Sequence, residues 1–321
     1  MRQSESLSKN SRAQTILPKN VRSTLRGHID LLDPVTWVSG PQGFISGALA
    51  SGAMLWDWQT FWLAFVGLVL VGPLTIGFSQ SINDFFDRDV DAINEPTRPI
   101  PAGLVTLRGA ILNFSLVGAL AILLSVGLAL TSKSGPILVI MTVLGLLLGV
   151  LYSMPPVEFK RNGLIGPLSV GFGYTLLTWL SGLLIFGPFK TEVLITALVN
   201  VSISAGLLIL NDIKSIEGDR KLGLHTLPVN YGVHNALKIS YAFIDSVQIF
   251  FAIYLITTGH FWIGLIQVVA LLVQLKAQRD LYTTPTHSQY KKYLLTGNGL
   301  ITVISLLAAL SFGGYTPFNS L

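Results

Sequence analysis

The chain has 321 residues, of which 51% are hydrophobic and 12% are charged, and its formal net charge is +5. Because a soluble domain is typically about 25% charged, this composition excludes an ordinary water-soluble protein and indicates a chain that lies mainly in lipid. The sequence has no cysteine, which excludes disulfides, thiolate metal sites and a cysteine nucleophile, and its five histidines show no metal-ligand spacing.

The N-terminal segment is polar and rich in serine and arginine over residues 1–28. It has no apolar core of the kind that a secretory signal requires. We therefore expect a disordered cytoplasmic tail. The predicted domain boundaries are a polar tail over residues 1–30 and a single transmembrane domain over residues 31–321.

Long apolar stretches follow one another along the rest of the chain. A helix needs about 20 mainly apolar residues to cross the hydrocarbon core of a bilayer. Nine candidate spans meet this description, at 35–55, 61–82, 109–130, 136–152, 163–186, 192–211, 236–257, 260–279 and 293–313. The pattern predicts an all-α integral membrane protein with nine transmembrane helices.

The basic residues predict the orientation of these spans, because cytoplasmic loops keep an excess of Lys and Arg. With nine spans and a cytoplasmic N-terminus, every Lys and Arg except Lys133 and Lys190 falls on the cytoplasmic side. We expect the protein to lie in a bacterial cytoplasmic membrane with its long loops in the cytoplasm. The positive charge then belongs to one membrane face, where it attracts anionic headgroups or substrates, and it does not indicate nucleic-acid binding.

The long loop after the second predicted span opens with an acidic motif. If the helix continues into this loop, Asn83, Asp84, Asp87 and Asp91 share one face and Asp89 lies on another. Carboxylates at this spacing repel one another, unless a hard cation such as Mg²⁺ lies among them. A solvated acidic loop is the alternative, but acidic residues at a membrane edge favour a functional site.

A second acidic motif closes the sixth predicted span on the same side of the membrane. It begins at Asn211, and Asp212 and Asp219 are two helical turns apart and so share a face. Ser215 lies between them, whereas Glu217 points elsewhere. Two such motifs on one side of the membrane fit a pair of Mg²⁺ ions that clamp one diphosphate.

Basic residues near the two motifs are candidate diphosphate ligands, because phosphate sites recruit Arg and Lys. Arg98 lies on a stretch stiffened by two prolines, Lys160 follows a pair of prolines, and Arg220 and Lys221 lie beside Asp219. We favour Arg98 and Lys160. For each of the four, the alternative is a surface charge that only sets the topology.

The motifs resemble those of the UbiA superfamily of intramembrane prenyltransferases, and most closely the chlorophyll and bacteriochlorophyll synthases. The resemblance is strongest in the runs DRDVDAINEPTRPIPAG (87–103), YSMPPVEFKRNGLIGPL (152–168) and NDIKSIEGDRKLGLHTLPVNYG (211–232). Ser215 replaces an acid that many members of the superfamily carry, but the pigment synthases share this serine. Asp33 stands where relatives usually have a basic residue, which puts a diphosphate contact from that position in doubt.

The resemblance implies a bundle of nine helices around a central cavity that opens to lipid. It implies Mg²⁺ held by the carboxylates of both motifs, namely Asp84, Asp87, Asp91, Asp212 and Asp219. It also implies a supporting set of residues around the diphosphate, namely Asn83, Arg98, Lys160, Asn211, Arg220 and Lys221. The expected reaction transfers a geranylgeranyl, phytyl or farnesyl chain from its diphosphate to the propionate of a (bacterio)chlorophyllide, the last step of (bacterio)chlorophyll biosynthesis.

Two kinds of alternative stay open at the level of the sequence. Within the superfamily, the acceptor is a quinone-ring precursor or haem, although an aromatic ring must lose a proton and the motifs contain no obvious His or Glu base. The other alternative is a membrane transporter, whose coupling-ion sites usually lie near the midplane of the bilayer and not at the ends of spans. Aromatic candidates for the cavity wall, with simple packing as the alternative, are Phe85, Phe86, Tyr174 and Trp179.

Overall fold

The fold is described here from a computed structural model that covers residues 21–52, 57–221 and 223–315. These residues form helices and loops with no named strand, and one isolated β-bridge joins Asn162 to His225. The first half of the bundle contains α1 (Val21–Asp30), η1 (Pro34–Val38), α2 (Ser39–Ala50), α3 (Trp58–Val69), η2 (Leu70–Ile76), α4 (Gly77–Asn94), α5 (Leu107–Thr131), α6 (Ile137–Ser153), η3 (Phe159–Arg161), α7 (Ile165–Gly171), η4 (Phe172–Leu176) and α8 (Leu177–Phe186).

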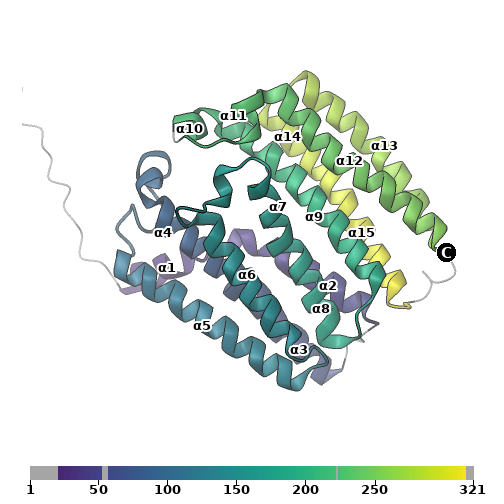
Figure 1. The fold of residues 1–321 in the computed structure, drawn as a ribbon, viewed down its shortest axis with the longest axis horizontal. Helices are drawn as coiled ribbons and strands as arrows, with labels where there is room; N and C mark the ends of the chain where they lie inside the picture. The colour runs from purple at the N-terminus through teal and green to yellow at the C-terminus, as the bar shows by residue number, and fades with distance from the viewer. Residues whose placement is uncertain (1–20, 53–56, 222, 316–321) are drawn as a thin grey trace, which may run out of the picture.

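The second half begins with the long helix α9 and ends near the C-terminus. It contains α9 (Thr191–Asp212), η5 (Ile213–Ser215), α10 (Ile216–Lys221), α11 (Leu227–Tyr231), α12 (Val233–Thr257), α13 (Phe261–Thr283), α14 (His287–Tyr293), η6 (Leu294–Asn298) and α15 (Gly299–Phe312). In Figure 1 the two halves lie side by side, with the short helices α10 and α11 and the loop after α4 gathered at the same end of the bundle.

Within the described residues, seven helices are long and apolar enough to cross a membrane. The predicted stretch 136–152 forms α6, a helix of 17 residues that is shorter than these seven. In the stretch 35–55, residues 53–55 lie outside the described part of the chain, and the described residues contain the short η1 and the 12-residue α2. Gly52 follows α2 in a left-handed conformation with φ 85°, which is a common way for a helix to end. The all-helical membrane fold is therefore confirmed, but the count of nine spans is not.

The N-terminal prediction was partly wrong. Residues 21–30 form the helix α1, where we expected a disordered tail, and residues 1–20 lie outside the described part of the chain. A contact from a distant helix explains the difference, because Asn113 Nδ2 on α5 donates a hydrogen bond to the carbonyl of His28 at 3.0 Å. Leu31, directly after α1, is fully buried.

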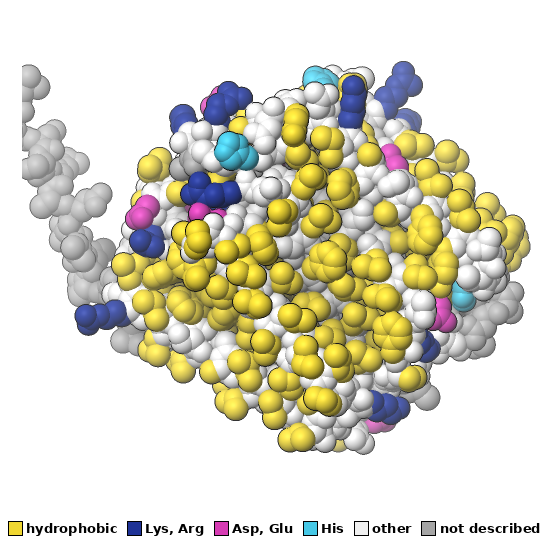
Figure 2. All heavy atoms as spheres, viewed as in Figure 1, with side chains coloured by type: hydrophobic (Ala, Val, Ile, Leu, Met, Phe, Trp, Pro, Cys, Tyr) yellow, Lys and Arg dark blue, Asp and Glu magenta, His cyan; other side chains and the backbone are white. Residues whose placement is uncertain are grey.

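Each half of the bundle has its own apolar core. One core lies among α9, α12, α13 and α15, and includes Val199, Leu237 and Phe251. The other lies among α2 to α8, and includes Phe44 and Phe78. On the face shown in Figure 2, apolar side chains cover the middle of the protein, and Lys and Arg lie toward the edges, as expected for a surface in contact with lipid.

Three of the long helices contain a turn of π-helix, namely η2, η4 and η6. Such turns are rare and often occur at functional sites. Pro73 lies inside η2, where it cannot donate the usual helical hydrogen bond. Both η2 and η4 contribute residues to the central cavity described below.

Candidate active site

The first acidic motif lies on a continuous helix, as its spacing predicts. Helix α4 runs to Asn94 and ends just before Pro96, a residue type that disfavours helix in the residue before it. Asp84 and Asp91 are buried, at 4% and 9% exposure. The side chain of Asp89 is 85% exposed and forms an ion pair with its neighbour Arg88 at 3.5 Å. Asp89 therefore points away from the acidic face.

The loop after α4 brings Arg98 back onto this face. Arg98 Nη1 donates a hydrogen bond to Asp84, and Arg98 Nε donates to Glu95 Oε2 at 2.7 Å. Asp91 Oδ2 lies 3.9 Å from Arg98 Nε. Burial alone would lower the pKa of Arg98, but the hydrogen bond to Glu95 and the charges of Asp84 and Asp91 raise this pKa above its usual value. Arg98 is thus a permanent positive charge beside two buried carboxylates.

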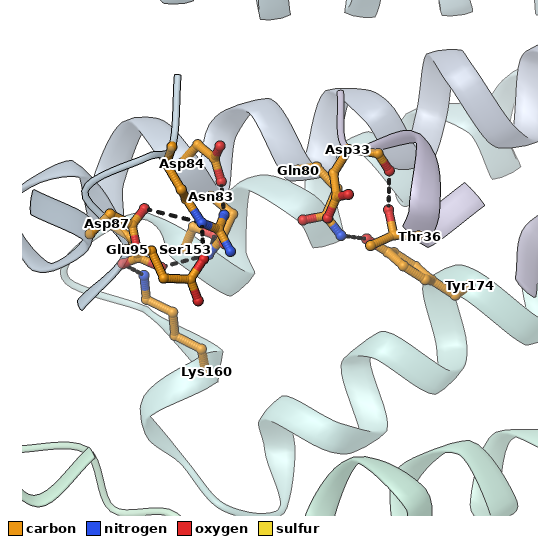
Figure 3. A network of polar contacts seen from close by, with 12 residues as sticks. Asp33, Thr36, Gln80, Asn83, Asp84, Asp87, Glu95, Ser153, Lys160 and Tyr174 are labelled. Carbon is orange, nitrogen blue, oxygen red and sulfur yellow. Dashed lines mark hydrogen bonds and ion pairs between the residues drawn. The ribbon is translucent and has the colours of Figure 1, made fainter. Parts of the chain in front are cut away.

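A second cation reaches the same helix from the loop after α6. Lys160 Nζ, on η3, forms an ion pair with Asp87 Oδ1. Asn83 Nδ2 donates to the other oxygen of Asp87 at 2.9 Å and to Ser153 Oγ at 3.2 Å. Figure 3 shows Asn83, Asp87, Ser153 and Lys160 as one connected group. The network fixes α4, α6 and η3 against one another.

The second acidic motif continues from α9 through η5 into α10. Asp219 is 9% exposed and accepts hydrogen bonds from Ser215 Oγ at 3.0 Å and from Thr226 Oγ1 at 3.2 Å. Ser215 therefore orients the carboxylate of Asp219. Thr226 lies beyond the motif, and sequence reasoning missed it because a lone threonine before a short helix gives no signal of its own.

Residues of both motifs line two adjacent cavities at one end of the bundle. A cavity of about 210 Å³ is lined by Asp87 and Lys160 from one side and by Asp212 and Asp219 from the other. It shares Asn83, Tyr152 and Leu208 with an adjacent cavity of about 440 Å³. The larger cavity is lined by further polar residues, including Asp33, Gln80, Arg98, Tyr174, Asn211 and Lys214.

Not every candidate residue lies at these cavities. Asp84 and Asp91 line neither of the two, and neither do Arg220 and Lys221, which are exposed on α10. Glu217 is exposed as well, as its position on the helix predicts. Lys214, which the sequence did not single out, lines the larger cavity. The basic groups at the site are thus Arg98, Lys160 and Lys214.

Among the aromatic candidates, two line cavities and two pack elsewhere. Tyr174 lines the larger cavity, and Gln80 Nε2 donates a hydrogen bond to its hydroxyl at 3.0 Å (Figure 3). Trp179 lines a neighbouring cavity. Phe85 and Phe86 pack edge to face, with ring centroids 5.3 Å apart, and line neither the larger cavity nor the smaller one.

In the described part of the chain, no three acidic or histidine side chains lie close enough to form a ready-made metal site. The predicted clamp of five carboxylates is instead divided among partners, because Arg98 pairs with Asp84 and Lys160 pairs with Asp87. The donor chemistry still fits Mg²⁺, which typically takes only one or two carboxylates and completes its shell with substrate phosphates and water. Asp91 Oδ2 is buried and has no hydrogen-bond partner. A carboxylate oxygen in that state is one that a bound cation would satisfy.

Comparison with known proteins agrees with this arrangement. The sequence pattern of the UbiA prenyltransferase family matches residues 43–299. Chlorophyll synthase from Avena sativa is 38% identical over 242 residues, which cover 74% of this chain and 63% of that protein. The 33 kDa chain of bacteriochlorophyll synthase from Cereibacter sphaeroides is 33% identical over 291 residues, which cover 90% and 93% of the two chains. The chain thus spans slightly less than two thirds of the length of the plant protein.

Solved structures agree on the fold. A UbiA homologue from Archaeoglobus fulgidus bound to GPP and Mg²⁺ superposes with a TM-score of 0.67 at 20% identity, over 90% of this chain and 99% of that one. A digeranylgeranylglyceryl phosphate synthase superposes with a TM-score of 0.68 at 22% identity, with the same coverage of 90% and 99%. At these identities the likeness concerns the fold alone.

Proposed function

The chain belongs to the UbiA prenyltransferase family, and on that premise we propose that it is a Mg²⁺-dependent (bacterio)chlorophyll synthase. In this proposal it transfers a polyprenyl chain from its diphosphate to the propionate of a chlorophyllide-type tetrapyrrole. One observation supports it above all. Asn83 and Asp87 of the α4 motif line the same cavity as Asp212 and Asp219 of the second motif, together with Lys160.

The diphosphate of the donor is assigned to these two adjacent cavities. Mg²⁺ would be held by Asp84, Asp87, Asp91, Asp212 and Asp219, with Asn83 and Asn211 in support. Bound there, the metal supplies positive charge that stabilises the leaving diphosphate. Mg²⁺ also accompanies the prenyl diphosphate in the homologue from Archaeoglobus fulgidus.

The protein's own cations act on the same leaving group. Arg98 and Lys160 each pair with a carboxylate in the structure, so both are already held at the cavity wall before any substrate arrives. Their N–H groups orient the phosphate oxygens and stabilise the charge that builds on them as the allylic C–O bond breaks. This preorganisation is worth most in a site from which water is excluded.

The acceptor oxygen attacks C1 of the prenyl chain while diphosphate departs, so one C–O bond forms as another breaks. A propionate is already ionised near neutral pH and needs no general base. The described residues that line the two cavities include no histidine or glutamate. This lining favours a carboxylate acceptor over a quinone-ring precursor, which must lose a ring proton.

The location of the site supports an enzyme more than a transporter. Seven apolar helices make the chain an integral membrane protein, and the acidic residues lie at the ends of spans, not at their middle. We place the site and the N-terminus on the cytoplasmic side of a bacterial membrane. The support for this orientation is the concentration of Lys and Arg in the loops that carry the motifs.

The proposal is tested with purified protein in detergent and a panel of acceptors. Chlorophyllide, bacteriochlorophyllide, a quinone-ring precursor and haem are each incubated with Mg²⁺ and with farnesyl, geranylgeranyl and phytyl diphosphates. We expect prenylated product from chlorophyllide or bacteriochlorophyllide and none from the quinone-ring precursor or haem, with no product from Asp84→Asn. Product from the quinone-ring precursor or haem alone would overturn the proposed acceptor, and product from none would overturn the proposed activity.

A further inference from the structure

The basic side chains that line the two active-site cavities differ in whether they already have an acidic partner. Arg98 forms an ion pair with Asp84, and Lys160 forms one with Asp87. Lys214 lines the larger cavity, and its ammonium group forms no ion pair and no side-chain hydrogen bond with any other described residue. Lys214 is therefore the basic group at this site that is available to a further anion.

The end of α9 directs neighbouring residues of the second motif to different cavities. The helix ends at Asp212 and continues as the single 3₁₀ turn η5, where Ser215 Oγ donates to the carbonyl of Asp212 at 3.1 Å. Side chains three residues apart share a face in such turns, and Asn211 and Lys214 both line the larger cavity. Asp212 and Asp219 line the smaller one. The motif thus presents carboxylates to one cavity and N–H donors to the other.

The wall of the larger cavity carries opposite charges at two places. Asp33 lines this cavity, and its charge acts on Asp84 of α4. The turn that carries Asp33 is fixed by Thr36 Oγ1, which donates to the carbonyl of Asp33 at 2.8 Å (Figure 3). The charge of Lys214 acts instead on Asp212, at the end of α9. A carboxylate that enters the cavity is repelled by Asp33 and attracted by Lys214.

The proposed reaction makes such a cation necessary, because both of its reactants are anions. Mg²⁺, Arg98 and Lys160 are assigned to the diphosphate of the donor. The acceptor carboxylate must approach that diphosphate beside Asp212 and Asp219, and like charges repel one another. Lys214 lies next to this acidic motif but faces the larger cavity, so it can offset the repulsion without competing for the diphosphate.

We propose that Lys214 binds the carboxylate of the acceptor and so selects acceptors that carry one. This inference rests on the proposed function, since it assigns a residue to the acceptor of that reaction. One carboxylate oxygen accepts a hydrogen bond from the ammonium group, and the other stays free to attack C1 of the prenyl chain. The ester C–O bond forms as the C–O bond to the diphosphate breaks, and Lys214 keeps its protons throughout.

The experiment asks whether Lys214 recognises the carboxylate itself. The two pigments are chlorophyllide and the methyl ester of its propionate, which keeps the ring system but lacks the negative charge. Their binding to the wild type, Lys214→Gln and Lys214→Arg is measured without donor, by titration of the pigment's fluorescence. The matched control is Lys276→Gln, which removes the same charge from an exposed position on α13 that lines neither cavity.

We expect the wild type and Lys276→Gln to bind chlorophyllide about fivefold more tightly than its methyl ester, the upper range for an ion pair near a protein surface. Lys214→Gln should bind both pigments equally, and Lys214→Arg should keep the preference because it keeps the charge. In the full reaction, Lys214→Gln should raise the KM of chlorophyllide about fivefold. The KM of the donor and the Mg²⁺ concentration for half-maximal activity should not change.

Lys214 is exposed, so its replacement leaves the packed core intact, and the melting temperature of each variant checks this. A preference for the free carboxylate that Lys214→Gln retains would overturn the inference, and ester formation by the wild type would still support the proposed function. A higher KM of the donor or a higher Mg²⁺ requirement, with pigment binding unchanged, would assign Lys214 to the diphosphate and also overturn the inference.

Two further outcomes separate this inference from the proposed function. If Lys214→Gln loses a preference that the wild type shows, but the wild type forms no ester, the carboxylate site stands and the proposed reaction fails. If the wild type binds neither pigment, both proposals are overturned.

Discussion

Lys160 forms an ion pair with Asp87, although 73 residues separate them along the chain. The pair joins the loop after α6 to the acidic face of α4, and Asn83 donates to the second oxygen of the same carboxylate at 2.9 Å. Lys160 and Asp87 line one cavity together with Asp212 and Asp219. The two acidic motifs and a basic residue thus meet around one space, which is the basis of the proposed diphosphate site.

The first prediction concerns the charge of Lys160. Lys160→Met should lower kcat/KM for the prenyl diphosphate by about 100-fold, because one preorganised charge at a leaving group is worth about this much. Lys160→Arg should retain more activity than Lys160→Met, since it keeps the charge. Steady-state kinetics measures both, with Lys221→Met on the exposed face of α10 as the matched control. Equal losses in Lys160→Met and Lys221→Met would contradict the assignment.

The second prediction concerns the orientation of Asp219. Thr226→Val removes one of the two hydroxyl groups that donate to this carboxylate but keeps the shape of the side chain. We expect the Mg²⁺ concentration for half-maximal activity to rise about tenfold, in line with the usual cost of losing a residue that orients a metal ligand. Thr226→Ser keeps the hydroxyl and should restore the wild-type value. A magnesium titration that is the same for Thr226→Val and the wild type would argue against this role.

The third prediction concerns the metal and its carboxylates. Chelation with EDTA should abolish prenyl transfer, and added Mg²⁺ should restore it. Asp84→Ala and Asp219→Ala, one from each motif, should each remove nearly all activity, because each motif supplies oxygen ligands that the other cannot replace. Activity is measured as esterified pigment per minute at saturating substrates. If both variants keep substantial activity, a metal site shared between the two motifs is excluded.

The fourth prediction concerns stability at the opposite end of the bundle. Lys190 Nζ donates to the carbonyl of Ala50 at 2.7 Å and to that of Phe312 at 2.8 Å, so it satisfies the C-terminal ends of both α2 and α15. Lys190→Met should lower the free energy of unfolding by about 1–3 kcal/mol, since it leaves these carbonyls unpaired. Thermal unfolding in detergent measures the change. The control is Lys133→Met, which removes an exposed lysine from the same side, and a melting temperature equal to that of the control would contradict this interpretation.

Much of the first acidic motif could be predicted from the sequence because its geometry is local. The spacing of Asn83, Asp84, Asp87 and Asp91 determines their shared face on any helix, and the same rule places Asp89 outside it. Arg98 and Lys160 could also be singled out from the sequence, since nearby prolines distinguish them from ordinary surface charges. Each of them lines one of the two cavities. The pairing of Lys160 with Asp87 was not predicted, because it depends on how α6 packs against α4.

Other features depend on contacts between distant parts of the chain, which a single sequence does not reveal. Thr226 reaches Asp219 only because α11 folds back toward α10. The helix α1 is held by Asn113 on α5, whereas its polar composition predicted disorder. In the first predicted span, α2 ends at Ala50, and Gly52 then takes a left-handed conformation. In these cases the composition and spacing of the sequence were not enough to predict the structure. A tertiary contact or a local backbone conformation determined it.

The proposed reaction is tested most directly by the mass of the pigment product before and after mild alkaline hydrolysis. We predict that incubation of the purified protein with chlorophyllide, Mg²⁺ and geranylgeranyl diphosphate releases diphosphate and yields a pigment in which a geranylgeranyl group replaces the proton of the propionic acid. Hydrolysis should then return chlorophyllide and free geranylgeraniol, because the new bond is an ester of the propionate. A prenylated product that resists hydrolysis, or a pigment of unchanged mass with every prenyl diphosphate, would contradict the account.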